Sequence, residues 1–371
     1  MPPRKKQKTV AVEDSPPVSF PSRPVTRPSQ TTTGIFTLPL ELLWLISTHF
    51  GLCIEVPHGI LRGDGDPVLG AEFRSRTTSL RAMAYTCDQL RQVYRPLLWQ
   101  SWNICVEPVH RAAFYKSLGD HLRKASLALA REAETRALIR TINVVLTRYS
   151  SAEVIPPFAR CMAQMPNLHT LQIIHAHTQM TTHLKNGFAN ITLSNIQRIV
   201  LPDHAHEILR CCPEVRHVIC MSSDGSKLVS AIGKCCKQVE IIEGFRLGEG
   251  NLLKRLVKAA PNVTEIRLKS FYGDHDTVTS LSSFKKLQTL EFSHQITLDE
   301  LAAGAALQVP AELVKSIDAA KVLLRNQTTT DKRLRVRFTH DIPRNWHGAA
   351  ARRKNWEEIS ETPFPVKEIP L

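Results

Sequence analysis

The chain has 371 residues, 43% of them hydrophobic, and a formal net charge of +14 at pH 7. This length predicts more than one structural unit and a full hydrophobic core. No apolar run approaches the ~20 residues that span a bilayer, which argues against a transmembrane helix. The positive charge leaves nucleic acid and acidic proteins open as partners, because net charge governs solubility and non-specific binding rather than fold.

The nine cysteines show no Cys-x-x-Cys spacing. An odd number of cysteines without this spacing predicts reduced thiols. The charged, proline-containing start of the sequence has no apolar signal core, which agrees with reduced thiols because disulfides form mainly in secreted proteins. We therefore expect an intracellular protein, in the nucleus, the cytoplasm or both.

Residues 1–34 are rich in proline, serine and threonine and hold few apolar side chains, which predicts a disordered tail. The tail contains a compact basic cluster of Arg4, Lys5, Lys6 and Lys8. Such a cluster is typical of a nuclear localisation signal. The alternative interpretation is a solubilising terminus without a targeting role.

A strongly apolar helix is predicted directly after the tail, beginning at Leu38 and Pro39. Proline is favoured at a first helical position because its missing N–H has no partner there. Leu42 and Ile46 repeat at helical spacing with Leu43 beside them, so apolar residues surround most of the helix. One apolar stripe is enough to pack a helix on its own domain. We therefore expect the other side of this helix to contact a partner.

A second helix is predicted from a cap at Ser79 to Pro96, where a proline is expected to end it. Leu80 and Cys87 are among its apolar positions, and Leu97–Leu98–Trp99 follows at once. A polar, glycine-containing insertion, Gly51–Thr78, separates the two predicted helices.

The leucine-proline start, the cysteine in the second helix and the closing Pro-Leu-Leu-Trp resemble the F-box, the adaptor-binding module of cullin-type ubiquitin ligases. Leu90 stands where the family commonly has tryptophan, and the insertion is longer than the usual link. The resemblance implies an F-box-like module at residues 35–105 that binds a Skp-family adaptor and, through it, a cullin scaffold. The alternative is a helical pair that caps a repeat domain. The adaptor-binding residues that the resemblance implies are Leu38, Pro39, Leu42, Leu43, Ile46, Leu80, Cys87, Leu97, Leu98 and Trp99.

A short strand, Trp99–Val106, and a helix, His110–Ala133, are predicted next. An apolar-x-x-apolar-x-apolar pattern then recurs, and helix-like segments precede most of its copies. It resembles the irregular leucine-rich repeats of about 20–29 residues that follow many F-boxes, although the asparagine expected after the third apolar position is missing. The sequence thus predicts an α/β fold in which the helical module precedes a leucine-rich-repeat solenoid, residues 106–300, with parallel strands and outer helices. The pattern begins at Ile139, Leu168, Ile196, Val215, Val239, Val263 and Leu287.

Residues 301–371 are predicted to form a C-terminal cap and tail. The segment Leu298–Leu324 has a helical pattern that Pro310 interrupts. Arg333–Phe338 alternates apolar residues with arginine, which predicts a half-exposed strand, either the last repeat or an edge strand. Trp346–Trp356 and the proline-rich end are expected to cover the open end of the repeats.

Motifs of known chemistry are not found in the sequence, so we expect a protein that is not an enzyme and holds no cofactor or metal. Histidines cluster around the second repeat, but no cysteine or carboxylate joins them at ligand spacing, which favours surface histidines over a metal site. The vicinal cysteine pairs are interpreted as core-filling residues. These side chains are His169, His175, His177 and His183, and Cys211, Cys212, Cys235 and Cys236.

The sequence is compatible with two functions. The first is the substrate-recognition subunit of a Skp-cullin-F-box ubiquitin ligase, whose repeats bind a protein substrate that the sequence does not name. The alternative is a nuclear scaffold or nucleic-acid-binding protein without a ligase role, although few aromatic residues interleave with the basic ones to stack on bases. Its candidate contacts are Lys332, Arg333, Arg335, Arg337, Arg344, Arg352, Arg353 and Lys354.

Overall fold

The structure of the protein is a computed structural model. Residues 40–371 form one compact unit and residues 1–39 another, and the sheet and its helices belong to the larger unit. The structure describes residues 38–39, 41–43, 45, 73–105, 114–221, 223–248, 250–269, 275–296, 309, 311–340 and 366–371.

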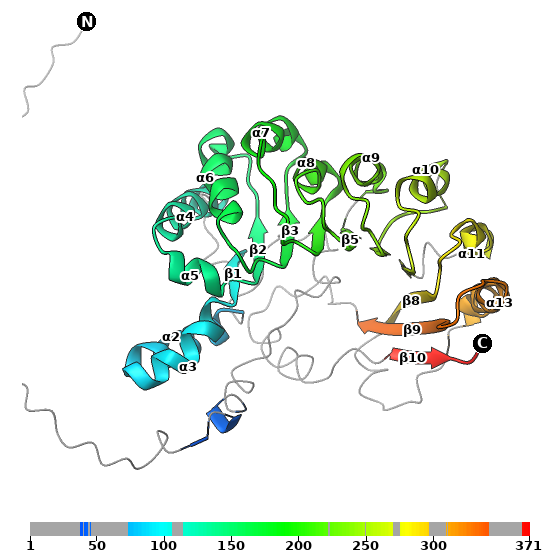
Figure 1. Ribbon diagram of the computed structural model, residues 1–371, viewed down its shortest axis with the longest axis horizontal. Helices are drawn as coiled ribbons and strands as arrows, with labels where there is room; N and C mark the ends of the chain where they lie inside the picture. The colour runs from blue at the N-terminus through cyan, green and yellow to red at the C-terminus, as the bar shows by residue number, and fades with distance from the viewer. Residues whose placement is uncertain are drawn as a thin grey trace, which may run out of the picture. The chain divides into compact units, whose positions relative to one another are not determined.

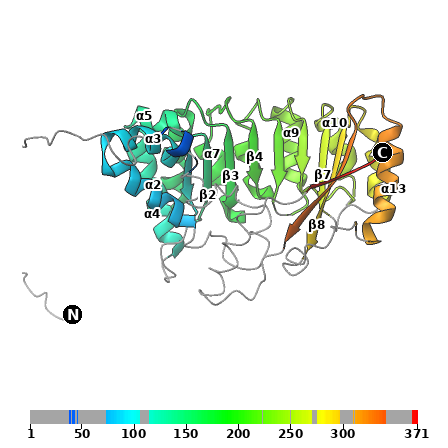
Figure 2. The ribbon, with the colours of Figure 1, turned by 90° about the horizontal axis from the view of Figure 1, so that it is seen from below.

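The larger unit is built on a ten-stranded sheet whose strands lie in chain order from β1 to β10 (Figure 1). Strands β1 to β9 run parallel, and β10 pairs antiparallel with β9. Figure 2 shows β2, β3 and β4 side by side. The strands are β1 (Ser101–Ile104), β2 (Thr141–Val145), β3 (Thr170–His175), β4 (Arg198–Leu201), β5 (His217–Cys220), β6 (Ile241–Glu243), β7 (Glu265–Lys269), β8 (Thr289–Ile296), β9 (Arg333–His340) and β10 (Val366–Ile369).

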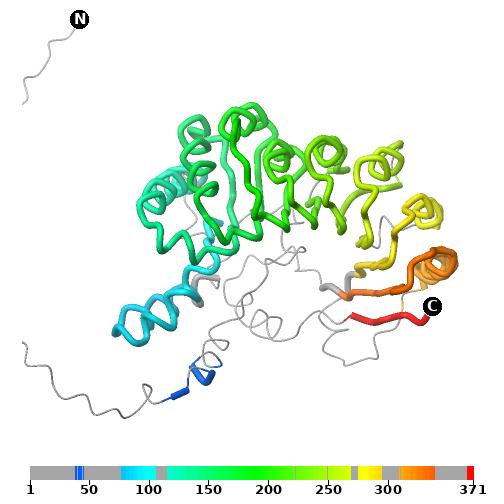
Figure 3. The backbone as a smooth tube through the Cα atoms, in the orientation of Figure 1, coloured from blue at the N-terminus to red at the C-terminus, as the bar shows by residue number. Residues whose placement is uncertain are grey.

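Helices connect the successive parallel strands, which cannot be joined by tight turns. The tube in Figure 3 follows this alternation, with the helices from α6 to α10 along one side of the sheet. The helices are α2 (Phe73–Thr86), α3 (Asp88–Trp99), α4 (Phe114–Leu129), α5 (Ala133–Leu138), α6 (Ser151–Ala163), α7 (Thr181–Gly187), α8 (His206–Leu209), α9 (Ser226–Cys235), α10 (Leu252–Ala259), α11 (His275–Ser280) and α13 (Ala311–Arg325).

The second apolar residue of each predicted repeat lies in register with that of the next. All of these side chains are buried between the strands and the helices. The mixed α/β class and the parallel strands predicted from the pattern are therefore confirmed. We call this row the apolar ladder, and its members are Trp102, Ile142, Leu171, Ile199, Val218, Ile242, Ile266, Leu290 and Leu334.

The backbone just before each strand repeats one hydrogen-bond pattern. The carbonyl of Gln100 accepts the N–H groups of Arg140 and Thr141, at 2.9 and 3.0 Å. One carbonyl thus aligns the start of the next strand, and the pattern holds the register from one repeat to another. Carbonyls in the same position accept two N–H groups at Arg140, His169, Gln197, Arg216, Glu240 and Thr264.

Asparagine side chains fasten several helix-to-strand turns. Nδ2 of Asn167 donates to the carbonyl of Ala137 at 2.6 Å, and Nδ2 of Asn195 donates to that of Pro166 at 2.7 Å. Each asparagine directly precedes the first apolar residue of its repeat. These contacts were not predicted, because the repeat pattern places its asparagine after the third apolar position.

The predicted second helix proves to be two helices, α2 and α3, separated at Cys87, whose φ and ψ are −158° and 170°. Because α2 already includes residues 73–78, Ser79 is not a helix cap and the predicted insertion is shorter than expected. Pro96 lies inside α3 and does not end it. A proline removes one hydrogen bond, here to the carbonyl of Gln92. Since Gln92 is exposed, water can donate a hydrogen bond to that carbonyl in place of the missing N–H.

The C-terminal strand pairing was not predicted. β9 covers the expected strand, but it lies between β8 and β10 and is not an edge. The edge position belongs to β10, four residues that were predicted to be part of the cap.

The predicted helix His110–Ala133 ends earlier, at Leu129, and α5 follows. Residues 4–8, Ile46, residues 51–72 and residues 346–356 lie outside the described part of the chain.

Asp203 provides a test of how the repeats are joined. It is buried, and its Oδ1 accepts the N–H groups of Lys227 and Leu228, at 2.9 and 3.2 Å, in the first turn of α9. We expect Asp203→Ala to lower the free energy of unfolding by about 1–3 kcal/mol in a urea titration, because the buried N–H of Leu228 and the partly buried N–H of Lys227 lose their acceptor. Asp203→Asn keeps an oxygen and should lose less.

The exposed Asp331, which pairs with Arg333 at 2.8 Å, is the control. Asp331→Ala should change the free energy of unfolding by less than about 1 kcal/mol. Equal losses for Asp203→Ala and Asp331→Ala would contradict the assignment of Asp203 as a link between repeats.

Candidate interaction surfaces

Helices α2 and α3 form a hairpin with a hydrophobic core of its own. The core consists of Leu80 and Ala84 on α2 and Leu90 and Tyr94 on α3, each pair spaced by one helical turn. It is distinct from the large core that the helices and the sheet share. Partly buried residues that pack around the small core are Met83, Cys87, Val93, Leu97 and Leu98.

The described part of the preceding helix, residues 41–43 and 45, is tied to this hairpin. The hydroxyl of Tyr94 donates to the carbonyl of Leu43 at 3.2 Å. Leu42 and Leu45 on the same helix are 43% and 55% exposed, and Tyr85 on α2 is 68% exposed. Leu42 and Leu45, three residues apart on one helix, therefore lie close together at the surface, and exposed apolar patches are typical of interaction sites.

The residues that the resemblance assigns to adaptor binding lie in several environments. Leu43 and Leu80 are buried, so they support the helices from within. Trp99 packs on the large core and anchors the hairpin to the sheet. Leu38 and Pro39 belong to the smaller unit, and Ile46 lies outside the described residues. The remaining residues are Leu42, which is exposed, and Cys87, Leu97 and Leu98, which are partly buried.

A second feature is the sheet face opposite the apolar ladder, where most of the side chains are buried. Successive side chains of a strand point to opposite faces, so the residue after each ladder member lies on this face. The row begins with amides, continues with Val200 and Ile219, and ends with charges. We call it the polar row, and its members are Asn103, Asn143, Gln172, Val200, Ile219, Glu243, Arg267, Glu291 and Arg335.

The charged end of the polar row is a network of ion pairs. Arg337 contacts both carboxylate oxygens of Glu291, at 2.7 and 3.2 Å, and Glu291 is 1% exposed. Arg267 lies 2.6 Å from Glu265 and 3.5 Å from Glu243. Burial by itself lowers the pKa of Arg267, but the neighbouring carboxylates outweigh it and raise the pKa above its usual value. The network therefore holds fixed charges of both signs.

His217 adjoins this network, with its Nε2 3.7 Å from Oε2 of Glu243. Burial lowers the pKa of His217, and the contact with Glu243 only partly offsets that effect. Burial therefore favours the neutral form of the ring. Neither His217 nor Glu243 was predicted as a site residue, because each lies in a different repeat and the two meet only through strand pairing.

The clustered histidines and cysteines show no metal arrangement within the described residues. The pKa of His175 is lowered by burial and by the nearby His204 and His177. The thiols of Cys212 and Cys236 are buried and donate to backbone carbonyls, and burial raises the pKa of Cys236 to about 12. These two cysteines fill the core as predicted.

No protein-family model matches the chain, and no curated protein matches it either. The helices of the described residues include none that is long and apolar enough to cross a bilayer. Functional conclusions therefore depend on the hairpin and the sheet themselves.

The ion-pair network predicts unequal effects of two glutamate substitutions. Glu291→Ala leaves Arg337, whose side chain is 34% exposed, without its partner, so the free energy of unfolding should fall by about 1–3 kcal/mol in a urea titration, because solvent replaces only part of the lost contact. Glu368, which pairs with Arg335 at 3.0 Å, is 68% exposed at its side chain. Glu368→Ala should therefore cost less than about 1 kcal/mol. A loss at Glu291 no larger than that at Glu368 would contradict a buried network.

Proposed function

We propose that the chain is the substrate-recognition subunit of a Skp-cullin-F-box type ubiquitin ligase, acting in the nucleus, the cytoplasm or both. The hairpin and the helix before it are the adaptor-binding element, and the repeats bind a protein substrate. The supporting observation is a helical hairpin with its own small core, continuous in sequence with β1 and flanked by exposed Leu42, Leu45 and Tyr85. The chain supplies binding, and a partner enzyme supplies the ubiquitin transfer.

Burial of Leu42 and Leu45 by an adaptor would contribute binding free energy. Fully burying a leucine side chain contributes about 1.5–3 kcal/mol, so covering two half-exposed leucines would strengthen an adaptor complex substantially. Their own chain leaves 43% and 55% of these residues accessible. A partner that covers them would also stabilise the hairpin, because anything that binds only the folded state does so by mass action.

In this proposal the sheet is an irregular leucine-rich-repeat solenoid. The support comes from the repeated register of the apolar ladder and from the recurring carbonyl pattern before each strand. Its polar row changes from amides through aliphatic residues to ion pairs.

Nucleic-acid binding has less support. The net charge of +14 favours it. However, Arg333, Arg335 and Arg337 are paired with Asp331, Glu368 and Glu291, respectively. Arginines that are already neutralised contribute little to phosphate contacts, which depend on unpaired positive charge.

Adaptor capture tests the proposal directly. The double variant Leu42→Glu/Leu45→Glu should reduce co-purification with a Skp-family adaptor at least about tenfold, because two charges would enter the proposed interface. The matched control is Val314→Glu/Val322→Glu on α13, whose residues are 44% and 57% exposed. The control should capture the adaptor like the unmodified chain. Equal capture by both variants, or no capture by the unmodified chain, would refute the proposal.

A further inference from the structure

The residues that directly precede the strands lie side by side, as their shared backbone hydrogen bonds require. Arginine occupies this position before β2, as Arg140, and before β5, as Arg216. Nη1 of Arg216 lies 3.5 Å from Oε1 of Glu240, which holds the same position before β6. Arg216 is therefore neutralised by the next repeat.

Arg140 has no such carboxylate beside it. The equivalent residue of the next repeat is His169, whose Nδ1 and Nε2 lie 3.1 Å from Oγ1 of Thr170 and 3.1 Å from Oε1 of Gln197. Both ring nitrogens of His169 are thus hydrogen-bonded to Thr170 and Gln197 and not to Arg140. No described residue forms an ion pair or a side-chain hydrogen bond with the guanidinium of Arg140, which is an exposed residue.

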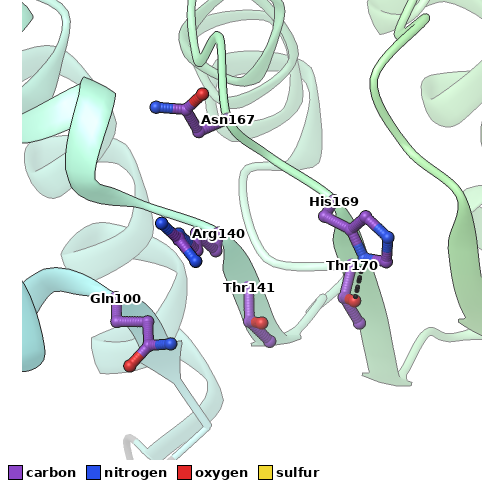
Figure 4. Close-up of a pocket in the computed structure, with 6 residues that line it drawn as sticks. All are labelled: Gln100, Arg140, Thr141, Asn167, His169 and Thr170. Carbon is purple, nitrogen blue, oxygen red and sulfur yellow. Dashed lines mark hydrogen bonds between the residues drawn. The ribbon is translucent and has the colours of Figure 1, made fainter.

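Arg140 lines a cavity of about 480 Å³ at this edge of the sheet. Figure 4 shows its side chain between those of Gln100 and Asn167, with Thr141 and the pair His169–Thr170 toward the other side. Small-molecule sites typically have volumes of about 300–1,000 Å³. None of the six lining residues is acidic, so the charge of Arg140 is not opposed within the cavity.

The donors that remain in this cavity can be counted. The backbone N–H groups of Arg140, Thr141, His169 and Thr170 are bonded to carbonyls of the preceding strand starts. Nδ2 of Asn167 is bonded to the carbonyl of Ala137. The donors left for a ligand are the guanidinium of Arg140, the side-chain amide of Gln100, the hydroxyl of Thr141 and the second N–H of Asn167 Nδ2. A planar guanidinium beside neutral donors matches the geometry of an oxyanion.

We propose that this cavity binds an oxyanion, either a phosphate or a carboxylate group, with Arg140 as its principal contact. The site adjoins the end of α3 through Gln100, but its principal contact, Arg140, lies outside the hairpin, before β2. Because Arg140, Asn167 and His169 are exposed, solvent screens the attraction, and a free anion should bind with a dissociation constant on the order of millimolar.

The test is a titration followed by nuclear magnetic resonance of the full chain, using the backbone amide signals of Thr141 and Thr170. Sodium phosphate and sodium acetate are added separately, with sodium chloride keeping the ionic strength constant. We expect saturable shifts with at least one oxyanion, and the responding one identifies phosphate or carboxylate as the ligand chemistry. No saturable shift with either anion would overturn the proposal.

Arg140→Gln should weaken the binding at least about tenfold while leaving the rest of the spectrum unchanged, since the residue is exposed. Arg216→Gln is the matched control, because it removes an arginine at the same position of another repeat, and it should leave the binding intact. An equal loss in both variants would indicate a general charge effect and would overturn the proposal. Adaptor capture should be the same for both variants, so this test and that of the proposed function can fail independently.

Discussion

The fold depends on the alignment of one apolar side chain per strand, from Trp102 through Ile142 and Leu171 to Leu334. A slip of one residue at any strand would turn its side chains to the opposite face. In β7 it would place Arg267 in the apolar core and Ile266 among the charged side chains of the opposite face. Since burying an aliphatic side chain contributes about 1.5–3 kcal/mol, the ladder fixes the register more strongly than any single polar contact. The polar row and the Arg140 cavity are positioned as consequences of that register.

The hairpin, unlike the sheet, has a small hydrophobic core. Among the described residues its core holds Leu80, Ala84, Leu90 and Tyr94, and it joins the rest of the larger unit through α3. Arg95 adds polar links, with Nη1 3.3 Å from Oε2 of Glu134 and Nη2 3.2 Å from Oγ1 of Thr135. So small a core contributes little stability by itself, because helices gain most of theirs from packing. A hairpin of this kind is suited to complete its packing on a partner, while the sheet needs none.

The strands were predictable because their apolar spacing repeats many times and each copy supports the same interpretation. The break at Cys87 and the continuation through Pro96 were not, since local rules favour one helix that ends at the proline, whereas packing around Tyr94 favours two. The pairing of β10 with β9 joins segments with no common pattern. The Arg140 cavity was hidden for a similar reason, because its side chains come from three successive strand starts.

Hydrogen–deuterium exchange of the full chain, read by mass spectrometry, tests the division into a self-sufficient sheet and a partner-dependent hairpin. Local opening requires less free energy where the core is small. Amides of β3 to β7 should therefore exchange slowest, those of α2 and α3 should exchange at least about tenfold faster, and a Skp-family adaptor should slow only the hairpin. Equally slow exchange in the hairpin and the sheet without any partner would contradict the account.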